Sequence, residues 1–192
     1  MTHNWRMHAL ALVLLAAAVV AVAPGASASH GPASGIITIN SHYDDDGALI
    51  TPHTCSTATP GLCQFTYASM PKWTGTFTGT SSNHAYGSFD PMTQEVHGVV
   101  WEYFPEVTVA GCGKGTMMWR GEIEMTPGEQ DPTTGGMVGH GTWTYVAGSG
   151  TGDLTKIVSG TFTSDHVVFK PPFMENHDDA VGTLICRNRS AR

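Results

Sequence analysis

Strict alternation of side-chain character is the feature of this sequence that most limits its fold. Over residues 72–80, Trp73, Gly75, Phe77 and Gly79 occupy every second position, and lysine and threonines fill the positions between them. Because successive side chains of a β-strand point to opposite faces, this period of two predicts a strand. Glycines beside aromatic residues make room for large rings and allow a sheet to bend, as a closed barrel requires.

The same pattern recurs along most of the chain. Runs rich in β-branched and aromatic residues on either side of the glycine-rich residues 148–152 predict a hairpin. A phosphate-binding loop is the alternative here, but the sixth position of the glycine motif is Asp153 and no Gly-Lys-Ser/Thr follows. With about eight or nine short strands and no amphipathic helix longer than two turns, the chain is predicted to be all-β.

Three stretches without periodicity are predicted to be surface loops, at residues 42–60, 127–136 and 173–179. The first contains Asp44-Asp45-Asp46-Gly47, which could resemble a calcium loop. It lacks the alternate-ligand spacing and the closing glutamate of such loops, which favours a solvated turn.

Residues 1–28 have the organisation of a secretory signal peptide. Arg6 precedes an apolar run at 9–23, and Ala26-Ser27-Ala28 forms a small-x-small cleavage site. A transmembrane helix is the alternative, but the run is shorter than the roughly 20 residues that a span needs. We therefore expect a secreted, extracellular protein with a flexible mature N-terminus at 29–34 and one folded domain at 35–192.

The charge balance argues against two classes of partner. The chain has 9 Lys and Arg against 16 Asp and Glu, a formal charge of −7, and loss of Arg6 with the signal would make it about −8. Such a surface repels phosphate backbones and anionic lipid. We expect no nucleic-acid partner and no membrane association after signal cleavage.

Four cysteines, Cys55, Cys63, Cys112 and Cys186, would remain in the exported chain. An even number in an oxidising environment indicates disulfides, for which three pairings are possible. We prefer Cys55 with Cys63, which closes a Pro-Gly turn, and Cys112 with Cys186. A zinc site is the alternative, but no C-x-x-C pair exists and the spacing is irregular.

The strand expected at 95–104 carries one acid on an otherwise apolar face. Glu102 shares that face with Val96, Val100 and Phe104. If the face lines the interior, burial would raise the pKa of Glu102, which is the condition for a general acid or base near neutral pH. Arg120 is the candidate catalytic partner, although the apolar face of its strand looks more like the interior and would leave Arg120 outside. A structural ion pair, or two solvated side chains, is the alternative.

Five aromatic residues lie on the glycine-bearing faces of their strands, namely Trp73, Phe77, Trp119, Trp143 and Tyr145. They are candidates for lining a ligand pocket, since such pockets are mostly apolar. Filling the barrel core is the alternative. The histidines show no metal-ligand spacing, and the mature chain contains no Gly-x-Ser-x-Gly, so neither a metal site nor a hydrolase triad is predicted.

Three segments together resemble the small secreted bacterial proteins of the allene oxide cyclase barrel-like family. They are WTGTFTG at 73–79, GCGKGT at 111–116 and GSGTGDLTKIVSG at 148–160, and the third is similar to a motif of plant allene oxide cyclases and dirigent proteins. The resemblance covers residues 72–163. It implies a single eight-stranded antiparallel β-barrel with a central pocket for an apolar molecule. Members with known activity guide cyclisation or coupling of bound intermediates without a cofactor, and no catalytic residue of theirs can be placed on this chain.

The expectation is therefore a disulfide-stabilised barrel that binds a small apolar molecule. Any reaction would be a cofactor-free cyclisation or isomerisation, promoted by shape and by Glu102. The alternative is a non-enzymatic extracellular barrel with a filled core that serves a structural or protein-interaction role. The ligand and the oligomeric state are left open.

Overall fold

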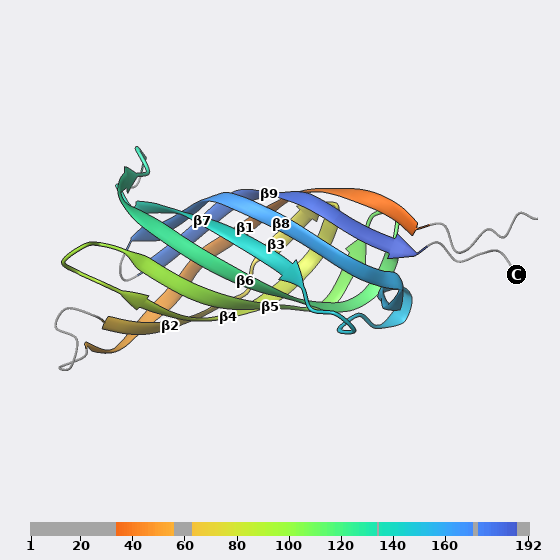
Figure 1. The fold of residues 1–192 in the computed structure, drawn as a ribbon, viewed down its shortest axis with the longest axis horizontal. Helices are drawn as coiled ribbons and strands as arrows, with labels where there is room; N and C mark the ends of the chain where they lie inside the picture. Colours follow the sequence, from red (N-terminus) through yellow and green to blue (C-terminus); the bar gives the residue numbers. More distant parts are fainter. Residues whose placement is uncertain (1–33, 56–62, 134, 171–172, 188–192) are drawn as a thin grey trace, which may run out of the picture. The chain divides into compact units, whose positions relative to one another are not determined.

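Antiparallel strands make up almost all of the computed structural model, which describes residues 34–55, 63–133, 135–170 and 173–187 (Figure 1). The predicted signal peptide and nearly all of the predicted flexible N-terminus lie outside the described residues. The elements are β1 Ser34–Cys55, β2 Cys63–Ser69, β3 Lys72–Gly75, β4 Phe77–Phe89, β5 Val96–Val109, β6 Gly113–Gln130, β7 Met137–Tyr145, the 3-10 helix η1 Gly152–Lys156, β8 Ile157–Lys170 and β9 Phe173–Arg187.

The strands close into an antiparallel barrel with eight strand positions. Sequential strands pair from β4 to β9, and β9 returns to pair with β1. The short strands β2 and β3 share the position between β1 and β4, because β3 pairs with β1 over Ser41–Asp44 while β2 pairs with β1 over Leu49–Cys55. The predicted single antiparallel barrel is confirmed.

Alternation decides which side chains enter the barrel. In β7, buried and exposed residues alternate along most of the strand, and Trp143 points inward between two glycines. A Cβ on Gly121 would lie 2.5 Å from Trp143 Nε1, and one on Gly141 would lie 2.1 Å from Trp143 Cζ3. The indole ring therefore occupies the space that two side chains would fill, which confirms the expected function of glycines beside aromatic residues.

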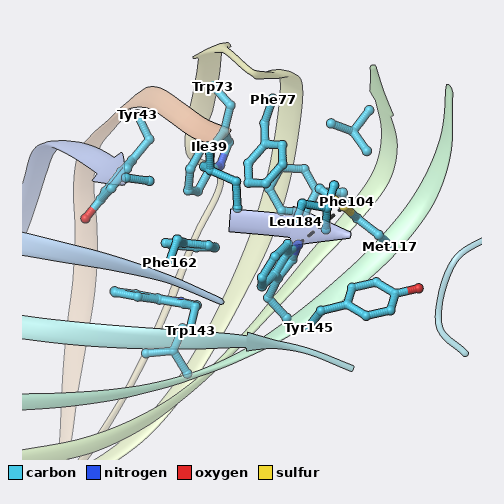
Figure 2. Packing of buried hydrophobic residues seen from close by; sticks show 14 of the residues in the cluster. Ile39, Tyr43, Trp73, Phe77, Phe104, Met117, Trp143, Tyr145, Phe162 and Leu184 are labelled. Carbon is cyan, nitrogen blue, oxygen red and sulfur yellow. Dashed lines mark hydrogen bonds between the residues drawn. The ribbon is translucent and has the colours of Figure 1, made fainter. Parts of the chain in front are cut away.

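Aromatic rings fill one part of the barrel interior. Trp73, Phe77, Trp119 and Phe162 lie with ring centroids between 4.9 and 6.1 Å apart where they contact one another. Trp143 stacks on Phe162 at 5.1 Å with an interplanar angle of 8° (Figure 2). Packing of this density stabilises the fold by burying large apolar areas and by edge-to-face and offset contacts.

The glycine-rich residues 148–152 form the connection between β7 and β8, as predicted. Gly148 and Gly152 adopt φ values of 77° and 58°, which L-residues with side chains rarely adopt. The short helix η1 follows and buries Leu154, so β8 begins at Ile157. No helix within the described ranges is long and apolar enough to cross a membrane.

A disulfide ties the β5–β6 turn to the last strand. Cys112 and Cys186 are bonded, and both are buried, which confirms this predicted pair. Cys63 is also disulfide-bonded, and Cys55 lies opposite it in the register of β1 and β2. The position of the Cys55 side chain lies outside the described part of the chain.

All three predicted loops contain strand residues, and the one predicted at 127–136 is wrong as far as Gln130, where β6 ends. The loop predicted at 42–60 is wrong as far as Cys55, because β1 continues through it, paired with β9 along one edge and with β3 and β2 along the other. The loop predicted at 173–179 is the start of β9 and pairs with both β1 and β8. Backbone pairing on both edges outweighs the low strand propensity of aspartate, proline and glycine.

Candidate functional site

A single carboxyl group lies inside the barrel on β5. Glu102 shares the inward face of the strand with Val100 and Phe104, and only 2% of its surface is exposed. The alternation Val-x-Glu-x-Phe places it there, because each of these residues is two positions from the next. The face that the sequence marked as apolar is thus the interior face of β5.

Polar side chains from β3 and β4 surround Glu102. Asn83 lies directly opposite Glu102 in the β4–β5 register and is 5% exposed. Ser81 is two residues before Asn83 and lies on the same inward face of β4. The Trp73 Nε1–H donates a hydrogen bond to Ser81 Oγ at 2.8 Å. A small polar group thus interrupts the apolar interior, with Glu102 at its centre.

Burial raises the pKa of Glu102 from its ordinary value of 4.5 to about 7. Hydrogen bonds from Ser81, Trp73 and Asn83 favour the carboxylate and oppose this rise, whereas the negative charge of the buried Asp45 adds to it. The acid and the carboxylate are therefore both populated near neutral pH. A group with this property can take up or release a proton without a large free-energy cost.

Two acceptor atoms of this cluster have no hydrogen-bond partner in the part of the chain that the structure describes. Glu102 Oε1 and Asn83 Oδ1 are both fully buried and unpaired. A buried acceptor without a donor typically costs about 1–3 kcal/mol. The pair is therefore suited to receive donors from a molecule that enters the barrel, such as a hydroxyl group.

Two buried tyrosines lie near the carboxyl group. Burial raises the pKa values of Tyr43 and Tyr67, and the charges of Glu102 and Asp45 raise both further. Tyr43 Oη is 2.7 Å from Ser164 Oγ, and the Ser164 hydroxyl donates to Asp178 Oδ2 at 2.5 Å. Both phenols therefore keep their protons at neutral pH, and Tyr43 is held by hydrogen bonds that connect β1, β8 and β9.

Apolar side chains enclose the interior beside this polar group. They leave a cavity of about 10 Å³, which is room for one water molecule. The residues around it are Phe65, Tyr67, Ala85, Val96, Gly98, Val100, Ile123 and Met125. A larger molecule would have to displace some of these side chains, among which Met125 is the most adaptable.

The structure does not bring Arg120 to Glu102. Arg120 lies on the outer face of β6, 43% exposed, and its Nη1 is 2.7 Å from Glu122 Oε1. Trp119 is the residue of β6 that faces Glu102 across the ladder. The apolar face of β6 is the interior, so alternation turns Arg120 outward.

Replacing Arg120 with alanine is expected to change the free energy of unfolding by less than about 0.5 kcal/mol, because its ion pair is exposed to water. Urea denaturation of the wild type, Arg120→Ala and Glu122→Gln at pH 7 measures this. A loss above about 1.5 kcal/mol for Arg120→Ala alone would contradict the purely superficial position of this side chain.

The five aromatic residues predicted to line a pocket all lie in the packed core. Trp73, Phe77 and Trp119 contact one another's rings or those of Phe104 and Phe162. Trp143 stacks on Phe162 (Figure 2). The Tyr145 ring lies edge-on to Trp119, and its hydroxyl oxygen accepts a hydrogen bond from the backbone N–H of Gly150. Of the five, Trp73 donates a hydrogen bond to Ser81 of the Glu102 cluster, and Trp119 lies opposite Glu102 in the β5–β6 register.

Sequence reasoning found Glu102 but missed its surroundings. Ser81 and Asn83 lie at alternate positions of one strand, where period two places them on the same inward face as Ala85. Period two groups these residues on one face, but it does not show that this face is buried. Tyr43 and Asp45 fell within a predicted loop, so their inward direction could not be read from the sequence. Among the residues with described side chains, no group of three or more His, Cys, Asp or Glu is placed to hold a metal ion.

Comparison with known proteins supports the fold and gives no information about function. No family model matches the chain. A search of curated proteins finds no match. Among solved structures, the chain is similar to a protein of unknown function from the DUF3224 family of Shewanella oneidensis MR-1, with a TM-score of 0.54 and 16% sequence identity. The match covers 81% of this chain and 100% of that one, so the two share a barrel fold.

Proposed function

We propose that this barrel binds a small, mostly apolar molecule that carries a hydrogen-bond donor, and that it does so at Glu102 without a cofactor. The observation that carries the proposal is the pair of buried acceptors, Glu102 Oε1 and Asn83 Oδ1, which find no hydrogen-bond partner among the described residues and lie in a mostly apolar interior. Ligand sites of proteins combine mostly apolar walls with a few polar groups that fix orientation. This cluster has that composition.

The ligand has to be accommodated by movement of the surrounding side chains. The 10 Å³ cavity beside Tyr67 and Val100 is smaller than any organic ligand, whereas the aromatic half of the barrel is already filled. Binding therefore expands the layer that contains Phe65, Tyr67 and Met125. The cost of that expansion makes the affinity sensitive to ligand size.

The chemistry available at the site is proton transfer. Glu102 can act as an acid or as a base near neutral pH, and the Tyr43 and Tyr67 phenols stay protonated beside it. A bound intermediate that rearranges by moving one proton is a suitable substrate. This fits the cyclase or isomerase-like activity that the resemblance to allene oxide cyclase barrel-like proteins implies.

We also propose that the protein is exported. The Cys112–Cys186 disulfide supports this, because disulfides form and persist in oxidising compartments outside the cytosol. Cleavage before Ser29 is the accompanying proposal, and N-terminal sequencing of protein from the culture medium tests it. Recovery of the chain from the cytosol with its N-terminal residues intact would overturn it.

A thermal-shift screen with matched pairs of ligands tests the binding proposal. Each pair consists of an alcohol and its methyl ether, such as cyclohexanol and methoxycyclohexane, measured at pH 8, where Glu102 is mostly ionised and accepts hydrogen bonds at both oxygens. The alcohol is expected to raise the unfolding midpoint by roughly 5–10 °C at 100 times its Kd. The ether has no donor and is expected to raise it much less.

The variant Asn83→Leu serves as the matched control, because it removes the amide acceptor, together with the Asn83 hydrogen bond to Glu102, and keeps the branched shape and the number of side-chain heavy atoms. It is expected to remove most of the difference between alcohol and ether. If no ligand moves the midpoint, or if alcohol and ether move it equally, the binding proposal fails. A structural or protein-interaction barrel would then be the remaining interpretation.

A further inference from the structure

A groove of about 730 Å³ crosses the outer face of the barrel over β2, β4, β5 and β6. It lies between two rows of outward side chains, each of which crosses the four strands from β2 to β6. One row is Gln64, Ser88, His97 and Glu124, and the other is Thr66, Tyr86, Val99 and Glu122. The row between them consists of inward residues and includes Gly87 and Gly98, which face each other across the β4–β5 ladder. The groove is therefore about 7 Å wide and about 14 Å long, from the spacing of residues and strands in a sheet.

The floor is closed from inside the barrel. A Cβ on Gly87 would lie 2.3 Å from the ring of Phe65, so that ring packs directly against the glycine backbone. Val99 adds an apolar surface at the edge of the groove. The volume is within the range of small-molecule sites, and the base is apolar.

The walls are aromatic and acidic. Tyr86 is 62% exposed on one row, and Glu122 and Glu124 have 65% and 77% of their side chains exposed at the β6 end. None of the described residues that line the groove is a lysine or an arginine. Arg120 pairs with Glu122 at 2.7 Å, and the Nδ1 atom of His97 is 3.9 Å from Glu124 Oε1.

We propose that this groove binds an organic cation, a quaternary ammonium or protonated amine with an apolar body. Val99 lies between Tyr86 on β4 and Glu122 on β6 in the same cross-strand row. A cation placed over Val99 is therefore about 5 Å from the strand of each neighbour. It contacts the face of the Tyr86 ring on one side and the Glu122 carboxylate on the other, while its apolar part covers the glycine floor.

Charge selects this class of ligand over anions. The formal charge of the chain, −7, and the two carboxylates of the groove repel anionic molecules. A neutral ligand would gain only exposed hydrogen bonds and the apolar floor. The cation gains those contacts and adds attraction to the ring and to both carboxylates, at a site separate from the interior of the barrel.

Titration with choline at pH 8 and low ionic strength, followed by NMR, tests this inference. Its neutral analogue, 3,3-dimethylbutan-1-ol, has nearly the same shape without the charge. Choline is expected to bind with a millimolar Kd and to shift the amide signals of Tyr86, Val99 and Glu122, while the neutral analogue binds at least fivefold more weakly. Addition of 0.5 M salt is expected to weaken choline binding and to leave the analogue unchanged.

Two variants with matched controls locate the site. Tyr86→Leu is expected to weaken choline binding about fivefold, and the double variant Glu122→Gln and Glu124→Gln by a similar factor. Tyr103→Leu removes another exposed ring on the outer face of β5 but outside the groove, and is expected to leave binding unchanged. The inference is overturned if choline does not bind, if its neutral analogue binds equally well, or if Tyr103→Leu weakens binding as much as Tyr86→Leu. Preferential binding of a neutral disaccharide such as cellobiose would also overturn it.

Discussion

Replacing Glu102 with glutamine is expected to stabilise the barrel relative to the wild type by about 3 kcal/mol at pH 9, and by close to nothing at pH 4. Burial raises the pKa of Glu102 from 4.5 to about 7, and that difference is worth about 3 kcal/mol. Below pH 4.5 the folded and unfolded states both hold the proton, so the wild type carries no penalty. As the pH rises from 4.5 through 7, the unfolded state releases its proton first and stability is lost.

Glutamine keeps the shape of the side chain and removes this titration. Urea denaturation of the wild type and Glu102→Gln at several pH values measures the difference, which is expected to reach its full size above pH 7. In thermal unfolding it corresponds to roughly 6–12 °C for a chain of this length. Asp45, Tyr43 and Tyr67 interact with the same carboxyl group, but they are present in both proteins, so the comparison isolates Glu102.

Glu124→Gln is the matched control, since this acid is on the outer face of β6 and largely exposed. It is expected to change stability by less than about 0.5 kcal/mol at either pH. A stability difference between Glu102→Gln and the wild type that does not vary with pH would contradict the buried, proton-exchanging state of Glu102. It would also remove the acid–base part of the proposed function.

Removing the Cys112–Cys186 disulfide is expected to have the largest effect on stability of any change considered. The two cysteines are separated by 74 residues, and closing a loop of that length restricts the unfolded chain by about 4 kcal/mol in the chain-entropy treatment. The double variant Cys112→Ala and Cys186→Ala is therefore expected to unfold roughly 8–16 °C below the wild type. Differential scanning calorimetry measures the change.

The predicted pair Cys55 and Cys63 provides the comparison. The loop between Cys55 and Cys63 is much shorter, and the same treatment gives about 2.5 kcal/mol for it. The variant Cys55→Ala and Cys63→Ala is expected to lose less stability than the first double variant. Equal losses of stability in the two double variants would contradict loop entropy as the source of the stabilisation by Cys112–Cys186. An unchanged midpoint for the Cys112 and Cys186 variant would contradict its stabilising role altogether.

The sequence predicted only part of the candidate site. A lone acid on the apolar face of β5 marks Glu102, because period two turns the side chains of alternate residues to the same side. The same alternation in β4 places Ser81 and Asn83 inward, but small polar residues in a strand do not by themselves show which face is buried. The inward positions of Tyr43 and Asp45 could not be predicted, because their segment is rich in residues that disfavour strands. This segment forms a strand because its backbone pairs with β9, β3 and β2.

Local sequence by itself determined that the chain is built of strands, the turn at 148–152 and the position of Glu102 on the apolar side of β5. These depend on the geometry of a pleated chain and on the backbone freedom of glycine, which act over a few residues. Local sequence did not determine every strand, because residues 72–80, predicted as one strand, fold back on themselves as β3 and β4 and leave Gly75 exposed. Only the tertiary structure decided that the five aromatic residues pack against one another and that Asn83 lies opposite Glu102. Closure of the barrel brings distant strands into register, and the register decides which side chains meet.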